Sequence, residues 1–470
     1  MANILMVKST STKMNLASCC EPKMNVCFHA ELKKLAELLN TICMYFSFHD
    51  FKLEDTTLRR YFYGLILFTF FPALLTAQFN FERKNDSFAF EPPKKISYYS
   101  HPHFNRVEGL SLQAGLKFVP FQNDFTIHTE LWYATSMDAD EALQYQISFE
   151  KGFKIPNALF VGAHYFDKIA SPDDWVNTDY ENSLAGLFAH RDYRDWYRQN
   201  GGMVFFDLRL RETHTIRFEV NHVDFEILDV LPNADWSLFS WAHDRTFAPN
   251  SIRHPFLSFA EGSETAFRAM FALDNRDNPI FPMSGWMLET IFEKTTGDFE
   301  TNGLFSTLKY FRTSFGNQRL QAKLMLGSRT DAWAAQHLMG LGGPGTLRGF
   351  EPKEFYGDRL LHGSVNYYFG GDVLQNLPLA FIPFWDTFSL GVFVDFGDAW
   401  LANGMAYPGS ANTGKSSAGL LDFDKFSSSN AHASPGLSLL IAEGLMRFDF
   451  AKRTEGDGGW QVYFHLLGKF

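Results

Sequence analysis

The chain has 470 residues, of which 17% are aromatic and 20% are charged, and 51 are phenylalanine. This composition excludes a bundle of membrane helices, because each helix needs about 20 consecutive apolar residues and the mean hydropathy is -0.17. The net charge of -11 leaves no basic surface to neutralise phosphates, so we expect no nucleic-acid partner. The same composition suits a membrane β-barrel, whose strands present one face to lipid and the other to water.

An export signal is the first recognisable element in chain order. The only long apolar run, at 61–75, follows Arg59 and Arg60 and ends shortly before a small residue. A basic start, an apolar core of about 15 residues and a small residue before the cut are typical of a secretory signal peptide. We therefore expect a signal peptide at 58–77. An uncleaved membrane anchor is the alternative, although Pro72 would interrupt it.

The segments on either side of this signal carry little structural information. We interpret residues 1–57 as a non-native or disordered extension that arises from a start codon assigned too early, with a genuine cytoplasmic extension as the alternative. All four cysteines lie in this extension, and a cysteine-free remainder is common in proteins that fold without disulfides in an oxidising compartment. Residues 78–103 are expected to form a short periplasmic lead-in. His101 and His103 fit ordinary loop histidines better than metal ligands, so we expect no metal and no cofactor.

Strand signals begin near Phe104 and continue to the last residue, Phe470. They alternate with a period of two: Ile216 and Phe218 share one face, for example, whereas Arg217 lies on the other. An aromatic-rich apolar face opposite a charged face is the pattern of a transmembrane strand. The C-terminal strand repeats the pattern, with an apolar face formed by Trp460, Val462, Phe464, Leu466 and Phe470.

The predicted fold class is therefore all-β: a transmembrane antiparallel β-barrel over 104–470. At roughly 24 residues for each strand with its connection, the chain after the signal peptide holds about 16 strands, and we expect about 14 to 18. The long outer loops are expected near 173–180, 231–255, 340–357 and 404–433.

One loop segment presents a single arginine among glycines. It reads LGGPGTLRGF over Leu341–Phe350. The glycine cluster allows the backbone to turn sharply, and it delivers Arg348, followed by Gly349 and Phe350, at the tip of the loop.

A second segment supplies a possible partner for this arginine. Alternation turns Phe393, Asp395 and Gly397 toward the lumen, whereas the intervening apolar residues face lipid. An inward carboxylate beside a glycine is a suitable dock for an arginine that enters from a loop. We therefore expect Arg348 to meet Asp395 inside the barrel.

A third segment predicts a rigid turn between two strands. It reads DNRDNPIFPMSGW over 274–286, with two prolines three residues apart and a glycine after them. The residues that define the turn are Asp274, Arg276, Asp277, Pro279, Pro282 and Gly285.

In this order, the three segments resemble the bacterial surface antigen family, the barrel shared by the outer-membrane assembly factor BamA, by TamA and by the two-partner secretion transporters. The resemblance covers about 104–470 and includes a Gly-x-x-Arg-x-Asp strand motif, matched by Gly444, Arg447 and Asp449. It implies an extracellular loop folded into the lumen, with its arginine on the aspartate of the docking strand. The chain departs from the family in having no room for periplasmic polypeptide-transport-associated domains before the barrel, and in placing leucine where the loop tip usually has valine.

The resemblance also implies a function. The segment FNRVEGLSLQAG, with Arg106, Glu108 and Gly109, resembles the first barrel strand of the family. We therefore expect a lateral seam between a strand near 106–117 and the C-terminal strand, where an exposed edge can template a nascent strand. The chain would insert or export proteins in the bacterial outer membrane, or serve as the barrel subunit of such a machine. The implied partners are outer-membrane lipid and lipopolysaccharide, together with envelope proteins or unfolded protein substrates.

Two alternatives remain open. A passive pore, or a structural partner barrel of another envelope complex, would share these features, and the loop motif could serve only to rigidify the barrel. An enzyme is not expected, because the chain has no Gly-x-Ser-x-Gly elbow, paired-histidine zinc helix or phosphate loop. A charged stretch predicts a lumen network or a strand end, with ligand binding as the lesser alternative, at Asp192, Arg194, Asp195 and Arg198.

Overall fold

The structure is a computed structural model that describes the chain between Ile96 and Leu466 with internal gaps. The expected extension, the signal peptide and most of the lead-in lie outside the described residues. The described ranges are 96–121, 125–153, 158–210, 213–237, 246–250, 259–279, 282–314, 318–370, 387–402, 419–423, 431–441 and 444–466.

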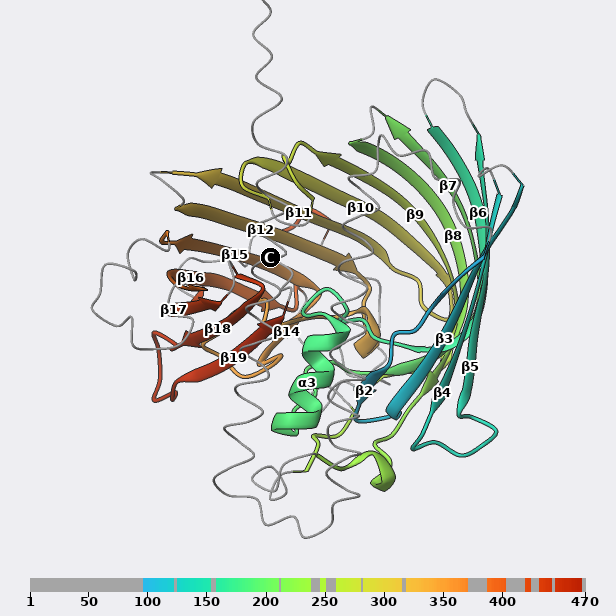
Figure 1. Ribbon diagram of the computed structural model, residues 1–470, viewed down its shortest axis with the longest axis horizontal. Helices are drawn as coiled ribbons and strands as arrows, with labels where there is room; N and C mark the ends of the chain where they lie inside the picture. The colour runs from blue at the N-terminus through green and yellow to red at the C-terminus, as the bar shows by residue number, and fades with distance from the viewer. Residues whose placement is uncertain are drawn as a thin grey trace, which may run out of the picture.

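One antiparallel sheet of 17 strands makes up most of the described chain and curves strongly (Figure 1). From β3 onward each strand pairs with the next strand in chain order, and β12 passes directly to β15. The first half comprises β3 (Gly109–Phe121), β4 (Phe125–Ala134), β5 (Leu143–Phe153), β6 (Ala158–Ala170), β7 (Tyr197–Leu210), β8 (His214–Ile227) and β9 (Gly262–Asp274). The second half comprises β10 (Gly285–Gly297), β11 (Asn302–Thr313), β12 (Arg319–Thr330), β15 (Arg359–Tyr368), β16 (Phe388–Trp400), β17 (His432–Ile441), β18 (Met446–Ala451) and β19 (Gln461–Leu466).

The sheet begins earlier than expected. Strands β1 (Ile96–Tyr99) and β2 (His103–Asn105) both pair with the outer edge of β3 and keep one register along it. They are two parts of one interrupted strand, so the 17 strands occupy 16 positions, in agreement with the predicted number. The expected start near Phe104 was therefore too late, because pairing already begins at Ile96.

The strand at this edge of the sheet is also not the one expected. The segment near 106–117 was predicted to flank the seam, but Arg106–Glu108 is a tight turn and β3 is the second strand position. The side chain of Asn105 accepts the N–H groups of Val107 and Glu108 at 2.9 and 2.7 Å. Asparagine side chains favour turns of this kind because they replace a backbone acceptor.

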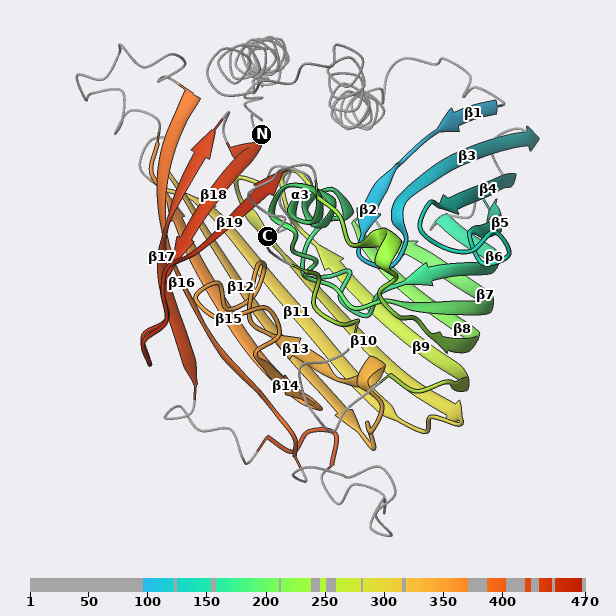
Figure 2. The same cartoon turned by 90° about the horizontal axis from the view of Figure 1, so that it is seen from below.

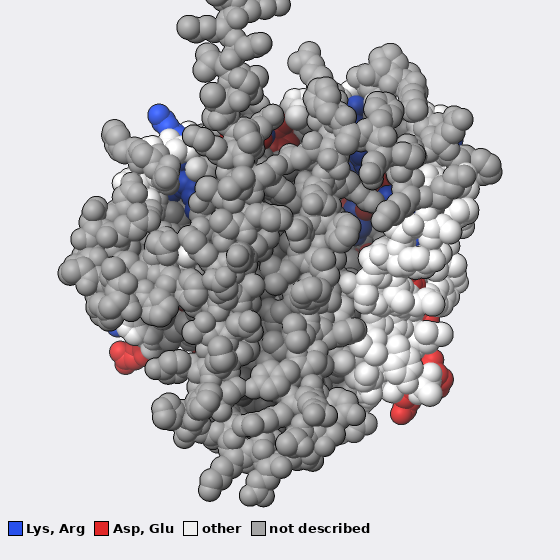
Figure 3. Space-filling view, in the orientation of Figure 1, with Lys and Arg blue, Asp and Glu red and all other residues white. Residues whose placement is uncertain are grey.

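Alternation sorts the side chains of each strand between two environments. On β16 the residues Leu390, Val392 and Val394 are exposed, whereas Phe393 and Asp395 are buried on the inner side, as the pattern predicted. On the described part of the face in Figure 3, the flank of the barrel is largely free of charged residues, which gather near its upper and lower rims. This distribution fits an outer surface in contact with lipid.

Two connections fold inside the curve of the sheet (Figure 2). The loop between β12 and β15 contains a small pair of strands, β13 (Met339–Leu341) and β14 (Phe355–Gly357), after the short helix η4 (Ala335–His337). The connection between β6 and β7 contains a helix, α3 (Asp179–Ala189), in a region where only a loop was predicted. A further short helix, η2 (Pro232–Ala234), follows β8. None of the helices in the described part of the chain has the length and apolar character needed to cross a membrane.

The two ends of the sheet do not pair with each other within the described residues. There, β19 pairs with β18, and the interrupted strand β1–β2 pairs with β3. Helix α3 contacts both β2 and β19, and it lies between these two strands in Figures 1 and 2. The boundary between the first and last strands, here called the seam, is therefore occupied by a helix.

The outward position of Val220 on β8 allows a direct test of the lipid-facing surface. Replacing Val220 with Arg should lower the free energy of unfolding in a bilayer by about 2–4 kcal/mol, because a charged side chain near the midplane must leave water. Urea titration of the protein folded into vesicles, followed by tryptophan fluorescence, measures this change. The control Val220→Leu should leave stability nearly unchanged, and an equal effect of both variants would contradict a lipid-facing position.

Candidate functional site

The loop between β12 and β15 enters the lumen as a compact turn. The backbone N–H of Gly343 donates to the Leu347 carbonyl oxygen at 3.1 Å, and the N–H of Gly342 donates to the Thr346 hydroxyl at 3.0 Å. These bonds hold the segment that precedes Arg348 in one conformation. Its apolar residues pack against the inner side of the sheet in a cluster of Leu341, Leu347, Phe350, Leu360 and Ala399.

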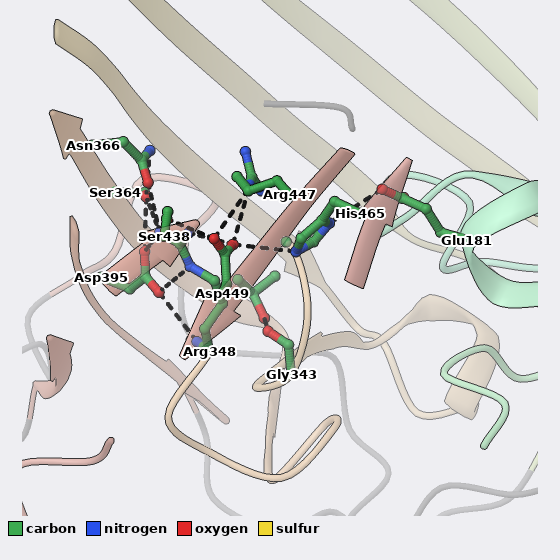
Figure 4. Close-up of polar contacts among 12 residues, drawn as sticks. Glu181, Gly343, Arg348, Ser364, Asn366, Asp395, Ser438, Arg447, Asp449 and His465 are labelled. Carbon is green, nitrogen blue, oxygen red and sulfur yellow. Dashed lines mark hydrogen bonds and ion pairs between the residues drawn. The ribbon is translucent and has the colours of Figure 1, made fainter. Parts of the chain in front are cut away.

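Arg348 stands at the tip of this turn among side chains from several strands (Figure 4). Its Nε and Nη2 donate to the two carboxylate oxygens of Asp395 at 2.8 and 2.7 Å, and its backbone N–H donates to the same group at 3.1 Å. Nη1 donates to Asp449 at 2.8 Å, and Nη2 also donates to Asn366 at 2.8 Å. The guanidinium carbon lies 3.4 Å from the ring centre of Phe393. The planar guanidinium thus engages a carboxylate bidentately and stacks on an aromatic face.

This ion pair lies out of water, so its hydrogen bonding must be complete. Arg348 is 4% exposed and Asp395 is fully buried. Burial alone would lower the pKa of the Arg348 guanidinium, but Asp395 and Asp449 raise that pKa above its ordinary value, so the group stays charged. The hydroxyls of Ser364 and Ser438 donate to Asp395 and Asp449 at 2.7 and 2.6 Å. A buried charge pair is tolerated when its remaining acceptor positions are filled in this way.

The other two residues of the loop tip have spatial roles. A Cβ atom on Gly349 would lie 2.6 Å from the Cβ of Ser434 and 2.7 Å from the backbone nitrogen of Arg453, so only glycine fits. Phe350 is buried, and its carbonyl oxygen accepts the hydroxyl of Tyr463 at 3.2 Å. The tip therefore contacts β17 and β19 as well as β16.

The predicted strand motif joins the same cluster. Gly444 precedes β18, which carries Arg447 and Asp449. Nε of Arg447 donates to Asp449 at 3.1 Å, and its Nη1 donates to the Tyr368 hydroxyl at 3.1 Å. Together with Arg348 and Asp395, the cluster contains two guanidinium groups and two carboxylates, so its charges balance.

A chain of polar contacts continues from this cluster to the seam (Figure 4). Oδ2 of Asp449 lies 3.2 Å from Nε2 of His465 on β19. Nδ1 of the same histidine lies 3.1 Å from Oε1 of Glu181 on α3, and the backbone N–H of Leu466 donates to that oxygen at 3.2 Å. The loop tip and the seam helix are thus linked through two side chains of the last strands.

Glu181 also stabilises the start of its own helix. Its Oε2 accepts the N–H of Thr178 at 2.8 Å, while the Thr178 hydroxyl accepts the N–H of Glu181 at 3.2 Å, which forms a capping box. Burial alone would raise the pKa of Glu181, but the hydrogen bond with His465 lowers it below its ordinary value. Glu181 is therefore an anion. One of its oxygens contacts β19, and the other caps the start of α3.

A second buried charge cluster ties the tip loop to the β6–β7 connection. Nζ of Lys353, shortly after the tip, lies 2.5 Å from Asp173 and 2.6 Å from Asp195. Arg106, in the turn after β2, pairs with Asp195 as well and donates to the Arg194 carbonyl oxygen at 2.8 Å. Burial alone would raise the pKa of Asp195, but Lys353 and Arg106 hold it below its ordinary value. The tip loop, the β6–β7 connection and the first hairpin therefore meet at one site.

The remaining predicted residues lie in several places. Arg194 pairs with Asp179 on α3 at 2.6 Å, whereas Arg198 pairs with Asp167 across β6 and β7 at 2.7 Å. Asp192 accepts the backbone N–H of Arg106 at 3.0 Å. The charged stretch thus contributes Asp192 and Arg194 to a side-chain network, whereas Arg198 lies at the start of β7.

The two neighbouring histidines have different partners. The His101 ring centre lies 4.4 Å from that of Tyr180, whereas Nε2 of His103 lies 3.0 Å from Glu108. Each ring therefore has a local packing or hydrogen-bonding role.

The proline turn lies between β9 and β10, away from Arg348. Asp274 pairs with Arg276 at 2.8 Å, and Nη1 of Arg276 donates to the Pro279 carbonyl oxygen at 3.2 Å. Oδ1 of Asp277 accepts the N–H of Met283 at 2.9 Å, one residue after Pro282. Gly285 is the first residue of β10. The motif forms a closed turn and does not join the lumen cluster.

A family model described as the Omp85 superfamily domain matches residues 156–470. The chain belongs to the Omp85 superfamily. This confirms the resemblance to the BamA-type barrels, the transmembrane β-barrel fold and the bacterial outer membrane as its location. Membership supports a general role in outer-membrane protein assembly or translocation.

Solved structures similar to this Omp85 chain have low sequence identity to it. BamA from Haemophilus ducreyi lacking POTRA domains 1-3 is 14% identical, with 79% of this chain and 69% of that chain covered and a TM-score of 0.49. CdiB from Acinetobacter baumannii is 11% identical, with 79% and 59% covered and a TM-score of 0.40. CdiB from Escherichia coli is 9% identical, with 80% and 62% covered and a TM-score of 0.39. The chain thus spans less than two thirds of both CdiB chains. No curated protein sequence matches it.

Several residues at the centre of this Omp85 lumen were missed in the sequence. Glu181 and the helix it begins carry a visible signal, because Thr178 and Glu181 have the spacing of a capping box. His465 and Tyr463 also have a visible sequence signal, because they are residues with polar groups on the inner face of the last strand. Lys353 has no signal of its own, because its two partners come from a distant connection.

The buried ion pair predicts a large loss of stability when Arg348 is removed from the Omp85 lumen. Arg348→Ala should lower the free energy of unfolding by about 3–5 kcal/mol, because Asp395 is left as an uncompensated buried charge. The free energy of unfolding of Arg348→Lys should lie between those of Arg348→Ala and the wild type, because lysine keeps the charge but loses the planar guanidinium. Urea unfolding in vesicles measures both effects.

A control comes from an arginine–aspartate pair whose arginine is half exposed and whose buried aspartate keeps a second partner, Arg217, at 3.2 Å. Arg209, at the end of β7, lies 3.4 Å from Asp207 and is 45% exposed at its side chain. Arg209→Ala should therefore change stability by about 0–1 kcal/mol. Equal effects at Arg209 and Arg348 would contradict the assignment of the tip arginine as a desolvated anchor.

Proposed function

We propose that this Omp85 chain inserts or exports proteins at the outer membrane, or is the barrel subunit of such a machine, through the lateral seam between β1–β2 and β19. The proposal rests on the backbone hydrogen bonding of the two strand edges. Within the described residues neither edge pairs with the other, and single backbone N–H groups on each are bonded to helix side chains instead. An edge of this kind can accept an added strand.

The loop bearing Arg348 would brace the barrel during this process. It contacts β15, β16, β17, β18 and β19 through the residues described above. These strands lie on one side of the seam. A loop anchored to these strands keeps them in register while the two edges of the seam separate. Rigidifying the barrel alone is the competing role for the same motif.

The partners follow from this role. The exposed apolar belt would contact outer-membrane lipid and lipopolysaccharide, and the seam would receive unfolded envelope proteins. The backbone of a strand edge has no side-chain code, so the proposal specifies an extended polypeptide rather than a particular protein.

Crosslinking at the seam tests the proposal directly, because residues 44–470 contain no cysteine. Tyr98→Cys on β1 and Val462→Cys on β19 place a thiol on each side of the seam at outward positions. We expect both to form adducts with a newly synthesised outer-membrane protein that carries an engineered cysteine in one of its strands, in cells treated with a short bis-maleimide. Leu308→Cys, equally outward but on β11, should form none. Adducts at all three positions, or at none, would exclude insertion at the seam.

A passive pore is the second candidate function, since the lumen contains a cavity of about 950 Å³. The two functions differ in planar-bilayer conductance. If the tip loop closes the lumen, the wild type should conduct little, and Arg348→Ala should open larger or more frequent channels, while Arg209→Ala behaves as wild type. A stably open wild-type channel that Arg348→Ala leaves unchanged would favour the passive pore.

A further inference from the structure

Helix α3 presents a hydrogen-bond acceptor to each edge of the seam. The Ser183 hydroxyl accepts the backbone N–H of Phe104 on β2 at 2.8 Å. Glu181 accepts the backbone N–H of Leu466 on β19 at 3.2 Å. Residues two apart point to roughly opposite sides of a helix, because each residue turns it by about 100°. The spacing of Glu181 and Ser183 therefore suits a helix that stands between two strands.

These contacts occupy groups that a strand would otherwise use. Each backbone N–H has a single proton, and those of Phe104 and Leu466 donate to the helix rather than to β3 or β18. Ser183 can accept because its own hydroxyl proton donates to the Asp179 carbonyl oxygen at 2.6 Å. The helix thus satisfies edge groups that would be costly to bury without a partner.

The helix is held both by polar contacts and by one apolar cluster. Its buried residues are Glu181, Asn182, Ser183, Gly186 and Leu187. Leu187 is the one large apolar side chain among them and packs with Phe104 and Phe247, and the partly buried Phe188 of the same helix packs against this cluster. Gly186 lets the Phe104 ring approach closely, since a Cβ there would lie 2.8 Å from it. An incoming strand can replace the two contacts to the edge N–H groups of Phe104 and Leu466 with backbone bonds of its own.

We propose that α3 is an exchangeable occupant of the seam, and that an extended polypeptide with alternating apolar and polar side chains displaces it. The incoming strand takes over the N–H groups of Phe104 and Leu466 that Ser183 and Glu181 hold. This inference rests on the proposed seam function and adds the step that controls access to it. It makes Glu181 and Ser183 positioning residues of the helix.

The probe for this exchange is a fluorescent peptide with the sequence of the chain's own segment 458–470, GGWQVYFHLLGKF, which includes β19. The full chain, with Cys19, Cys20, Cys27 and Cys43 replaced by serine and carrying Glu181→Cys and His465→Cys, is folded into phosphatidylethanolamine–phosphatidylglycerol vesicles. The two introduced thiols are then joined by a short reducible linker. With the helix fixed to β19, we expect no peptide binding above that of a scrambled peptide. Cleaving the linker with a reductant should restore binding.

Single variants test the same exchange without a linker. Glu181→Ala should bind the peptide at least about tenfold more tightly than the wild type, because losing a charge-assisted hydrogen bond raises the fraction of molecules with an open seam. Glu181→Gln retains one acceptor and should be intermediate. Glu226→Ala removes an exposed carboxylate on β8, a strand that does not border the seam, and should bind like the wild type.

Hydrogen exchange provides a readout that is independent of peptide binding. The amide of Leu466 should exchange faster in Glu181→Ala than in the wild type, and that of Phe104 should exchange faster in Ser183→Ala. Unchanged exchange in both variants would overturn the inference.

The outcomes separate this inference from the proposed function. Peptide binding could be the same with and without the linker and in Glu181→Ala. That result would show that the seam binds a strand without competition from the helix, and it would overturn only the exchange. Failure of the peptide to bind any form, including the reduced double variant, would overturn the seam function and the exchange together. Loss of binding on linking, with recovery on reduction, supports both.

Discussion

The ion pair between Arg348 and Asp395 is the contact on which the arrangement of the lumen depends. Moving either charge out of water costs several kcal/mol, and only a complete set of hydrogen bonds offsets this. The partners come from β15, β16 and β18, so these strands must be in register before the guanidinium is satisfied. Conversely, a loop that stayed outside would leave Asp395 and Asp449 close together without the cation that they share. Loop insertion and the pairing of the last strands therefore stabilise each other.

The tip loop also connects the two sides of the seam. Arg348 engages strands near the end of the chain, whereas Lys353 engages Asp173 and Asp195 in the connection that carries α3. Arg106, in the first hairpin, shares the carboxylate of Asp195. Displacing the helix would therefore disturb the contacts of both charge clusters, the one around Arg348 and the one around Lys353. The seam is bordered by buried charge clusters, and the helix between its edges is held by a few polar contacts and one apolar cluster.

Much of this arrangement could be predicted from the sequence because the relevant patterns are local. Two-residue alternation identified the strands, and a glycine-rich segment with one arginine identified the tip and its dock at Asp395. The first strand was placed too late, because Pro102 and its neighbours interrupt the pattern between β1 and β2. Helix α3 was missed because its few apolar residues give a weak period, although the capping box of Thr178 and Glu181 was present. The partners of Lys353 depend on tertiary folding and leave no trace in neighbouring residues.

The contact between Glu181 and His465 joins residues 284 positions apart in the chain. Contacts of such long separation form late, because the loop that they close has a high entropic cost. The contact of α3 with β19 can therefore form only after the last strand has been added to the sheet. A newly made barrel of this kind has two bare edges for most of its own folding, and the boundary that later serves as the seam is also the last part of the molecule to be completed.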